Sequence, residues 1–317
     1  MTCGTEGAPL DAPAAGTSPA SGLASWGVRA LRRGVLRGSS ELWREFPWRA
    51  TRDPWLVLVS EVMLQQTQAG RVVDPFDRFV ARFPTPAACA GAGSAEVVRA
   101  WAGLGYNRRA LNLHRTATLL VERHGGRVPD QLAALEALPG VGPYTARAVL
   151  AFAFDRPVGV VDSNVMRVLT RAAAGRGLAP SEAQRLADLL VPPADAWRFN
   201  QALMDLGASY CTARTPSCGC CHLAEQCRFA RAVARAGAGA AVADPAAPTR
   251  RRQGRFAGSD REGRGRLVGA LRLGPVQARA LASTAGWPGD ERRAMRVAGA
   301  LVTEGLASWQ HGALVLA

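Results

Sequence analysis

The stretch Leu138–Ala146, LPGVGPYTA, places two glycines in a turn between two segments of helical apolar spacing. Because glycine carries no side chain, this turn can approach a partner closely, and the N–H groups that open the following helix point outward. Such a turn can bind a phosphate group of a nucleic acid without recognising its base sequence. Ordinary packed helices also use such turns, but the flanking Leu138-Pro139 and the apolar segment 146–154 favour a helix–hairpin–helix element that binds DNA. The predicted DNA contacts are Leu138, Gly140, Val141 and Gly142.

Apolar residues at helical spacing continue on both sides of this turn, whereas strand-like alternation is scarce before the C-terminus. The segment 55–67 is apolar on nearly all sides, so we expect a buried helix with Pro54 in its first turn. Residues 156–161 are predicted to be extended. Further helices are expected over residues 74–83, 94–102, 108–124, 131–138, 146–154, 164–173, 181–190 and 198–206. The predicted fold class is therefore mainly α.

The two ends of the chain differ from this helical body. Residues 1–24 are rich in Ala, Gly, Pro, Ser and Thr, so we expect a disordered leader. Residues 229–262 have the Ala, Gly, Pro and Arg content of a linker. Helical spacing then recurs over 263–272, 276–285 and 290–304, and LASWQHGALVL (Leu306–Leu316) predicts a hairpin with its turn at His311-Gly312. Three helices and a two-stranded wing indicate a winged-helix-like module over 263–317.

The charge balance is strongly positive, since 39 basic and 25 acidic side chains give a net charge of +14. Such a charge suggests a polyanionic partner such as nucleic acid. A GC-rich genome explains why arginine replaces lysine, but not the surplus of bases over acids. No uninterrupted apolar run reaches the roughly 18 residues of a transmembrane helix. The N-terminus lacks the features of a secretory signal. We therefore expect a cytoplasmic protein associated with the bacterial nucleoid.

All 39 basic residues are arginine, and the sequence contains no lysine. Lysine amines form Schiff bases and act as general bases in many enzymes. The N-terminal amine is the only amine in this chain. The composition therefore excludes any reaction that needs an imine with an internal lysine.

Two carboxyl side chains occupy sequence positions that suggest chemistry. Glu61 lies inside the apolar run WLVLVSEVML (Trp55–Leu64), where a carboxyl group must be paired, protonated or functional. Asp162 lies where the chain changes from extended to helical, which suits an N-cap. Burial would raise the pKa of Glu61, whereas the helix end would keep Asp162 ionised. A salt bridge and a plain cap are the structural alternatives, but together the two groups suit cleavage of a glycosidic bond.

Five of the seven cysteines cluster within residues 211–227. A cluster in a chain without a secretory signal indicates a metal site rather than disulfides. The spacing C-x6-C-x2-C-x5-C has one close pair and two flanking cysteines, whereas zinc sites usually have two close pairs. The spacing therefore favours a 4Fe-4S cluster, with Cys220 left over as a competing ligand. The predicted ligands are Cys211, Cys218, Cys221 and Cys227.

Six motifs follow one another along roughly residues 25–230. They are SEVMLQQTQ (Ser60–Gln68), GLGYNRRALNLH (Gly103–His114), LPGVGPYTA (Leu138–Ala146), VDSNVMRVLTR (Val161–Arg171), FNQALMDLGA (Phe199–Ala208) and the cysteine spacing. In this order they resemble the MutY adenine DNA glycosylases, members of the helix–hairpin–helix superfamily that remove adenine mispaired with 8-oxoguanine. The resemblance implies an iron–sulfur cluster domain from residues 25–54 and 160–228, and a six-helix domain from residues 55–159.

The resemblance also implies a role for individual residues. Glu61 would protonate ring nitrogen 7 of adenine, and Asp162 would stabilise the sugar cation or trap it covalently. Tyr144 would line the site beside Asp162, and Asn164 would help to orient Glu61. Flipping the base out of the duplex costs a few kcal/mol, and side chains that fill the gap offset part of that cost. Gln65 and Tyr106 would wedge into the duplex near the 8-oxoguanine, and Gln66 would contact DNA beside them.

The chain departs from related patterns at several positions. Endonuclease III cuts the strand through a lysine in the hairpin motif, where this chain has Tyr144, so the resemblance implies a glycosylase without strand cleavage. Met166 and Asn107 replace a basic residue and a second tyrosine found in some family members. Residues 245–317 do not resemble the Nudix-like domain that family members use to check for 8-oxoguanine. With 12 arginines against 5 acidic residues, they suggest a basic accessory module.

Two other functions stay open at this point. A non-catalytic, damage-sensing or regulatory DNA-binding protein could use the same tail, although the presence of both Glu61 and Asp162 speaks against it. A zinc-structured nucleic-acid binder would explain the cysteines. The favoured prediction is a monomeric glycosylase that acts on double-stranded DNA with adenine opposite 8-oxoguanine or guanine.

Overall fold

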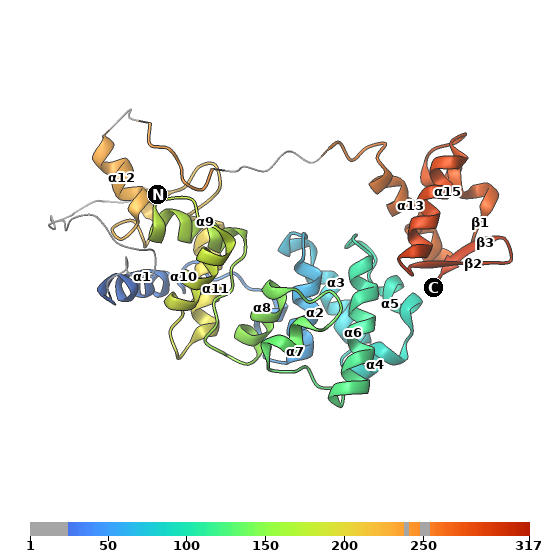
Figure 1. Cartoon of the computed structure of the whole chain (residues 1–317), viewed down its shortest axis with the longest axis horizontal. Coiled ribbons are helices and arrows are strands. Elements are labelled where there is room, and N and C mark those ends of the chain that lie inside the picture. Colours follow the sequence, from blue (N-terminus) through green and yellow to red (C-terminus); the bar gives the residue numbers. More distant parts are fainter. Residues whose placement is uncertain (1–24, 238–240, 248–253) are drawn as a thin grey trace. The chain divides into compact units, whose positions relative to one another are not determined.

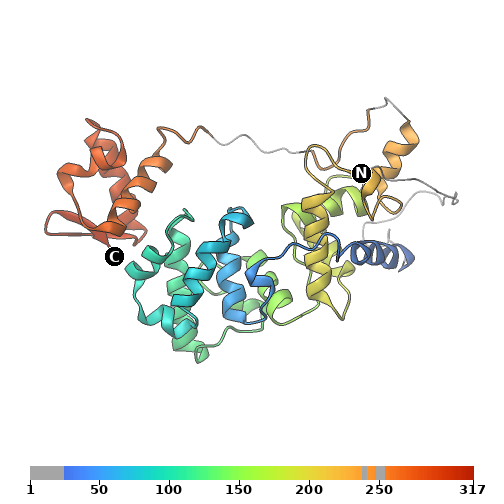
Figure 2. The same cartoon turned by 180° about the vertical axis from the view of Figure 1, so that it is seen from behind.

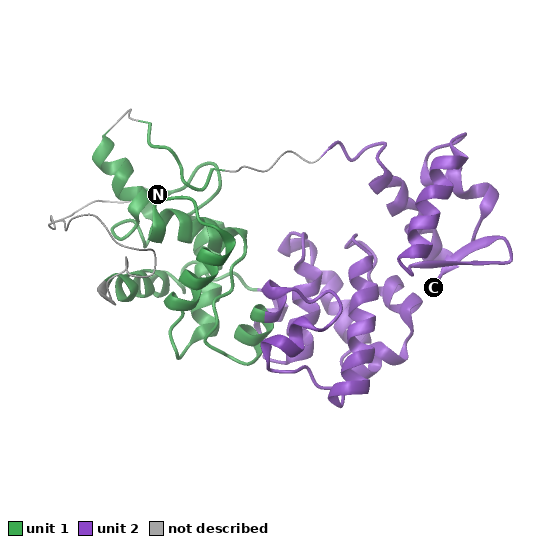
Figure 3. Cartoon of the chain, viewed as in Figure 1, with its two compact units in different colours: residues 1–45, 147–250 green, residues 46–146, 251–317 purple. Residues whose placement is uncertain are grey.

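The computed structural model of the 317-residue chain describes residues 25–237, 241–247 and 254–317. The regular elements of the described part are helices, apart from one small antiparallel sheet near the C-terminus (Figure 1). The predicted mainly α fold is therefore confirmed. It divides into two compact units, one drawn from residues 1–45 and 147–250 and the other from residues 46–146 and 251–317 (Figure 3). The predicted leader, 1–24, lies outside the described residues. None of the described helices combines the length and apolar composition needed to cross a membrane.

Unit 1 is a helical body in which α11 (Ala196–Ser209) has most of its side chains buried. Helices α1 and α9 both pack on α11, as Figure 2 shows from behind. Buried Leu31 from α1 and buried Phe199 and Leu203 from α11 contribute to this core. The other helices of the unit are α1 (Ser25–Arg37), α8 (Pro143–Ala153), whose first turn belongs to unit 2, α9 (Ser163–Val168), α10 (Pro180–Leu190) and α12 (Arg228–Ala236).

Unit 2 contains six helices before the hairpin turn, and the longest of them, α6, packs against α4, α5 and α2. Phe79 and Trp101 meet edge to face in its core, with ring centroids 5.7 Å apart. Such aromatic pairs add to the stabilisation that burial alone provides. The six helices are α2 (Pro54–Leu64), α3 (Val73–Arg82), α4 (Pro86–Gly91), α5 (Ser94–Ala100), α6 (Arg108–His124) and α7 (Leu132–Glu136).

The buried helix predicted from the apolar run is α2. Asp53 caps it, since its Oδ1 accepts hydrogen bonds from the backbone N–H groups of Trp55 and Leu56, and Pro54 is in the first turn as predicted. The helix ends at Leu64 rather than at residue 67, because Gln66 takes a left-handed conformation with φ of 57°. Few residues other than glycine adopt that conformation, so the chain leaves the helix there.

The C-terminal module of unit 2 combines three helices with a sheet of order β1-β3-β2. The predicted hairpin is present, and its turn at His311-Gly312 has positive φ at both residues, as a two-residue hairpin turn requires. The helix predicted over 276–285 is wrong at its start, because Val276 and Gln277 pair with β3 as a third strand. The elements are α13 (Asp260–Leu273), β1 (Val276–Gln277), α14 (Leu281–Ala285), α15 (Glu291–Thr303), β2 (Ala307–Gln310) and β3 (Ala313–Leu316).

Three further elements differ from the sequence prediction. The helix expected over 164–173 is two segments, since α9 ends at Val168 and a π-helical turn, Leu169–Ala174, follows. Helix α4 was not predicted. Helix α12 occupies the start of the stretch whose composition predicts a linker, and parts of that stretch, 238–240 and 248–253, lie outside the described residues.

Candidate functional site

Glu61 lies in the middle of α2 and is 5% exposed. The helix buries it because neighbouring Leu58, Val59 and Met63 are fully enclosed in the core of unit 2. Burial in such surroundings disfavours the charged form of a carboxyl group, because the charge loses its hydration. The structure therefore gives Glu61 the buried setting that the sequence predicts.

Asp162 is the N-cap residue of α9, as its place between an extended and a helical segment predicts. Its Oδ1 accepts a hydrogen bond from the backbone N–H of Val165 at 2.7 Å, and its Oδ2 accepts one from Nδ2 of Asn164 at 2.9 Å. Burial raises the pKa of the Asp162 carboxyl, while these hydrogen bonds and the charge of Arg167 oppose the shift without cancelling it. The helix end thus moderates the effect of burial on the pKa of Asp162 without removing it.

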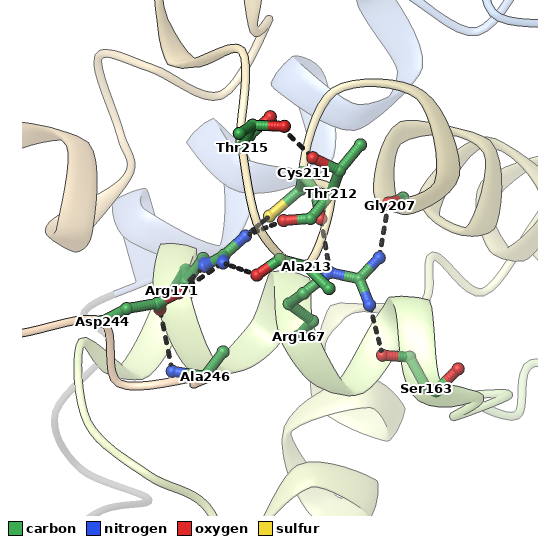
Figure 4. Close-up of polar contacts among 10 residues, drawn as sticks. All are labelled: Ser163, Arg167, Arg171, Gly207, Cys211, Thr212, Ala213, Thr215, Asp244 and Ala246. Carbon is green, nitrogen blue, oxygen red and sulfur yellow. Dashed lines mark hydrogen bonds and ion pairs between the residues drawn. The ribbon is translucent and has the colours of Figure 1, made fainter. Parts of the chain in front are cut away.

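A chain of hydrogen bonds runs from Asp162 to the cysteine loop within unit 1. Asn164 donates to Asp162, and Nη2 of Arg167 donates to Oδ1 of Asn164 at 2.8 Å. The same Arg167 also donates to the carbonyl oxygens of Gly207 and Cys211 (Figure 4). Gly207 permits this close packing of α11 on α9, since a Cβ there would lie 2.8 Å from Cβ of Asn164. Arg167 therefore joins the candidate catalytic carboxylate to the cysteine loop.

The extended segment before Asp162 is fixed by a buried amide that sequence reasoning missed. Oδ1 of Asn200, in α11, accepts from the backbone N–H of Val160 at 2.9 Å, and its Nδ2 donates to the carbonyl of Val158 at 3.0 Å. Asn200 is 1% exposed, so the oxygen and nitrogen of its side-chain amide take the place of solvent for the backbone of this extended segment. Its only sequence signal was a polar residue on the apolar face of a predicted helix.

The hairpin turn exposes backbone to solvent, while its apolar side chains are buried. Leu138 and Val141 are buried, whereas Gly140 and Gly142 are exposed. Gly140 has a φ of 77°, and a Cβ there would lie 2.9 Å from Asn112, so only glycine fits. Any DNA contact by Leu138 or Val141 would therefore be made through their backbone groups. Tyr144 follows in the first turn of α8 and is half-buried.

Arg109 ties together the two segments predicted to wedge into DNA. Its guanidinium donates to the carbonyl oxygen of Gln65 at 2.6 Å and to those of Leu104 and Gly105 at 3.1 and 3.2 Å. It also stacks 5.4 Å from the ring centroid of Tyr106. Burial lowers the pKa of Arg109 to about 10. Sequence reasoning missed this residue, because a single arginine in an arginine-rich helix carries no local signal.

Tyr106 and Gln66, the residue after the wedge candidate Gln65, are exposed and have positive φ. Tyr106 is 50% exposed with φ of 45°, and exposed Gln66 has φ of 57°. Residues other than glycine rarely adopt positive φ. Such backbone conformations persist where the surrounding structure imposes them, often at functional sites. Nε2 of Gln65 donates to the carbonyl of Gly140 and to Oγ1 of Thr145, both at 3.2 Å. Unit 2 thus brings Gln65, Tyr106 and the hairpin turn together through hydrogen bonds and Arg109.

Four of the five clustered cysteines line one apolar cavity in unit 1, and the exposed Cys220 is not among its lining residues. Burial raises the pKa of the Cys221 thiol to about 11 against a backbone hydrogen bond from Leu223, and the neighbouring thiols add to the shift. Within the part of the chain that the structure describes, no three His, Cys, Asp or Glu side chains are arranged to hold a single metal ion. The lining supplies four thiols around one apolar space, and four thiolates are the ligand set of an iron–sulfur cluster. The lining cysteines are Cys211, Cys218, Cys221 and Cys227.

Arg171 encloses one side of this cysteine loop and is 1% exposed. Its guanidinium donates to Sγ of Cys211 at 3.4 Å and to the carbonyl of Thr212 at 2.7 Å. Asp244 accepts from both Nε and Nη2 of Arg171 (Figure 4), which raises the pKa of the arginine and lowers that of the carboxyl. A bidentate pair of this kind fixes the direction of the guanidinium. Segment 241–247, after α12, thereby returns to brace the loop.

Comparison with known proteins places the chain in a family. Residues 59–193 match the family model "HhH-GPD superfamily base excision DNA repair protein". The adenine DNA glycosylase of Mycolicibacterium smegmatis is 42% identical over 267 residues, which cover 83% of this chain and 87% of that protein. The adenine DNA glycosylase of Mycobacterium tuberculosis is 44% identical over 271 residues, covering 84% and 86%. An alignment confined to residues 1–228 would cover a smaller part of this chain than these 83% and 84%. The similarity therefore extends beyond the cysteine loop.

The chain also has the fold of a solved structure. The structure of a thermostable thymine-DNA glycosylase is 32% identical and superposes with a TM-score of 0.62, covering 65% of this chain and 98% of that one. The predicted resemblance is therefore confirmed by family, by relatives and by fold. The chain belongs to the MutY-type adenine DNA glycosylases, DNA glycosylase enzymes of the helix–hairpin–helix superfamily of base excision DNA repair.

Proposed function

We propose that this enzyme excises adenine mispaired with 8-oxoguanine or guanine from double-stranded DNA and leaves the strand intact. The observation that carries the proposal is the half-buried Asp162 carboxylate, which is held by the end of α9 and by Asn164. A carboxylate fixed in this way is suited to stabilise a positive charge that develops beside it. Adenine would have to leave the base stack to reach it.

In the proposed reaction, Glu61 donates a proton to nitrogen 7 of the flipped adenine, which makes the base a better leaving group. The bond between C1′ and nitrogen 9 then breaks, and its electron pair leaves with adenine. Asp162 stabilises the resulting sugar cation until water adds at C1′ and gives up a proton to the Glu61 carboxylate, which leaves an abasic site. Asn164 positions Asp162 through its Nδ2 hydrogen bond. In this proposal Tyr144 would contact the flipped base.

DNA binding would draw on both the hairpin turn and the wedge segments. The outward N–H groups after Gly142 would bind phosphate, as a helix N-terminus does. Gln65 and Tyr106 would enter the duplex near the base opposite adenine, with Gln66 beside them, and Arg109 would hold the two segments in register. We further propose that the enzyme acts as a monomer.

The cysteine loop is proposed to hold a 4Fe-4S cluster through the four cysteines that line the cavity. When bound, such a cluster supplies four iron–thiolate bonds that fasten the loop. The chain's own contribution is the arrangement of donors, in which Arg171 donates to Cys211 and the backbone N–H of Ala230 donates to Cys227. Cys220 takes no part in this assignment.

Serine substitutions separate the four ligand positions from Cys220. We expect Cys218→Ser and Cys221→Ser each to lose most of the iron and the brown colour of the purified protein, because a serine oxygen is a poor ligand for iron–sulfur clusters. Cys220→Ser is the matched control and should keep both. Iron per chain and visible absorption measure the outcome. Full iron content in Cys218→Ser, or stoichiometric zinc in a colourless wild-type protein, would contradict the assignment.

Single-turnover assays on defined duplexes test the proposed reaction. Adenine opposite 8-oxoguanine or guanine should be released to give abasic sites that break only after alkali. Borohydride should trap no covalent adduct with an internal residue, since the chain has no lysine to form the imine. Strand breaks without alkali, or an adduct mapped to an internal side chain, would overturn the proposal of a monofunctional glycosylase.

A further inference from the structure

The C-terminal module contacts the loop that carries Tyr106. Arg272, at the end of α13, donates through Nη2 to Oδ1 of Asn107 at 2.7 Å and through Nε to the carbonyl oxygen of Val98 at 3.1 Å. Asn107 is the residue directly after Tyr106 and is only 8% exposed. A side chain that lies 165 positions further along the chain therefore holds the base of the candidate wedge loop.

Two further contacts anchor the module beside this bond. Oγ of Ser94, at the start of α5, donates to the carbonyl oxygen of Ala317. Gly305, at the start of the hairpin, approaches α6 closely, since a Cβ there would lie 3.0 Å from Arg115 and 3.7 Å from Leu111. The module thus rests on α5 and α6, the two helices between which the Tyr106 loop runs.

The surroundings of Arg272 indicate positioning rather than phosphate binding. Both recorded acceptors of its guanidinium are neutral oxygens, and burial lowers the pKa of Arg272. Placing a charged side chain there costs desolvation that neutral acceptors only partly offset. Exposed arginines of the same module, such as Arg279, are the ones available to solvent and to phosphate. The guanidinium fork instead joins the backbone carbonyl of Val98 to the side chain of Asn107 with two directed hydrogen bonds.

We propose that Arg272 is a positioning residue, through which the C-terminal module sets the conformation of the Tyr106 loop and thereby contributes to reading the base opposite adenine. The part that concerns the opposite base rests on the proposed function. The part that concerns loop conformation does not, because the hydrogen bond to Asn107 acts on the free protein. One experiment therefore tests the effect on loop conformation, and a second tests the effect on reading the opposite base.

The first experiment measures hydrogen exchange at the amides of residues 103–109 in the full-length protein without DNA. Arg272→Ala should accelerate this exchange by about tenfold, as loss of a hydrogen bond to a charged group implies. Arg272→Lys can supply one of the two hydrogen bonds. Its exchange rate at these amides should therefore lie between those of the wild type and Arg272→Ala. Arg279→Ala, an exposed arginine of the same module, is the control and should match the wild type. If Arg272→Ala also matches the wild type, the positioning role is overturned.

The second experiment compares single-turnover adenine release opposite 8-oxoguanine and opposite guanine. Arg272→Ala should lower the ratio of the two rates, Asn107→Ala should lower it equally, and the double variant should add nothing, because both changes remove one interaction. Additive losses would overturn the proposal. If Arg272→Ala fails to fold, Arg272→Lys and Asn107→Ala decide the outcome by the same two measurements. Failure of the wild type to release adenine from either duplex would refute the proposed function, while the exchange result would still stand.

Discussion

Replacing Glu61 with glutamine should slow single-turnover release of adenine by about a hundredfold to ten-thousandfold, the range expected when a general acid is removed. Glutamine has the size of glutamate, so the packing of α2 around this buried position should survive. The amide cannot deliver a proton to adenine, and the base then leaves as a poor anion. Affinity for the mispaired duplex should stay unchanged, because the backbone of the hairpin turn and the wedge segments are untouched.

A second glutamate provides the control for this substitution. Glu122 lies on the exposed face of α6 in the same unit, and Glu122→Gln makes the same change of a carboxyl to an amide. We expect wild-type rates for that variant in the same single-turnover assay. Full adenine release by Glu61→Gln would mean that another group supplies the proton, whereas loss of activity in both variants would point to net charge as the cause.

Replacing Asp162 with asparagine should reduce adenine release by about a hundredfold to a thousandfold, as loss of one group that stabilises transition-state charge typically does. Asparagine can still cap α9 through its side-chain oxygen. It carries no negative charge to face the sugar cation. In the wild type, activity needs the ionised carboxylate, so the raised pKa of Asp162 should move the acidic limb of the rate profile to higher pH than an ordinary aspartate would give.

The same raised pKa predicts how stability depends on pH. The folded state holds the Asp162 proton more tightly than the unfolded state, so the free energy of unfolding falls as pH rises from 3.8 through the raised folded value. Asp162→Asn lacks this decrease. Its free energy of unfolding relative to the wild type should therefore increase over that interval, by about 1.4 kcal/mol for each unit of pKa shift.

Urea unfolding of both proteins across this pH range measures the difference. Asp77→Asn, at an exposed position on α3, is the control and should show no such trend. A relative stability of Asp162→Asn that does not change with pH would mean that burial leaves the carboxyl unperturbed. A relative stability that falls with pH would mean that the helix end and Asn164 outweigh burial.

Local chemical signals made much of this fold predictable. Pro54 after Asp53 marks the start of α2 within a few residues, and the apolar run after it has no solvent-tolerant face. Gly140 takes a positive φ that glycine adopts without strain, so the two glycines of the turn signal it in the local sequence. Asp162 as a cap follows from the change of local pattern. In each case the residues that determine the structure are neighbours in the chain.

The residues that sequence reasoning missed act across long separations. Arg109 holds Gln65 from 44 positions away, and Asn200 holds Val160 from 40 positions away. Buried polar side chains of this kind are selected by the unpaired backbone groups they meet in the folded state. No window of sequence contains both partners, so neither role has a local pattern. The strand β1 was missed for the same reason, since Val276 becomes a strand only by pairing with Leu314.

The sequence by itself determined the family, the order of the motifs, the candidate carboxyl groups and the absence of lysine chemistry. These depend on which residues are present and on short-range spacing. Only the tertiary structure decided which four cysteines share a cavity, that burial outweighs the helix end at Asp162, and that Arg272 of the C-terminal module bonds to Asn107. Those outcomes depend on which surfaces are desolvated together, a property that arises only when distant segments pack.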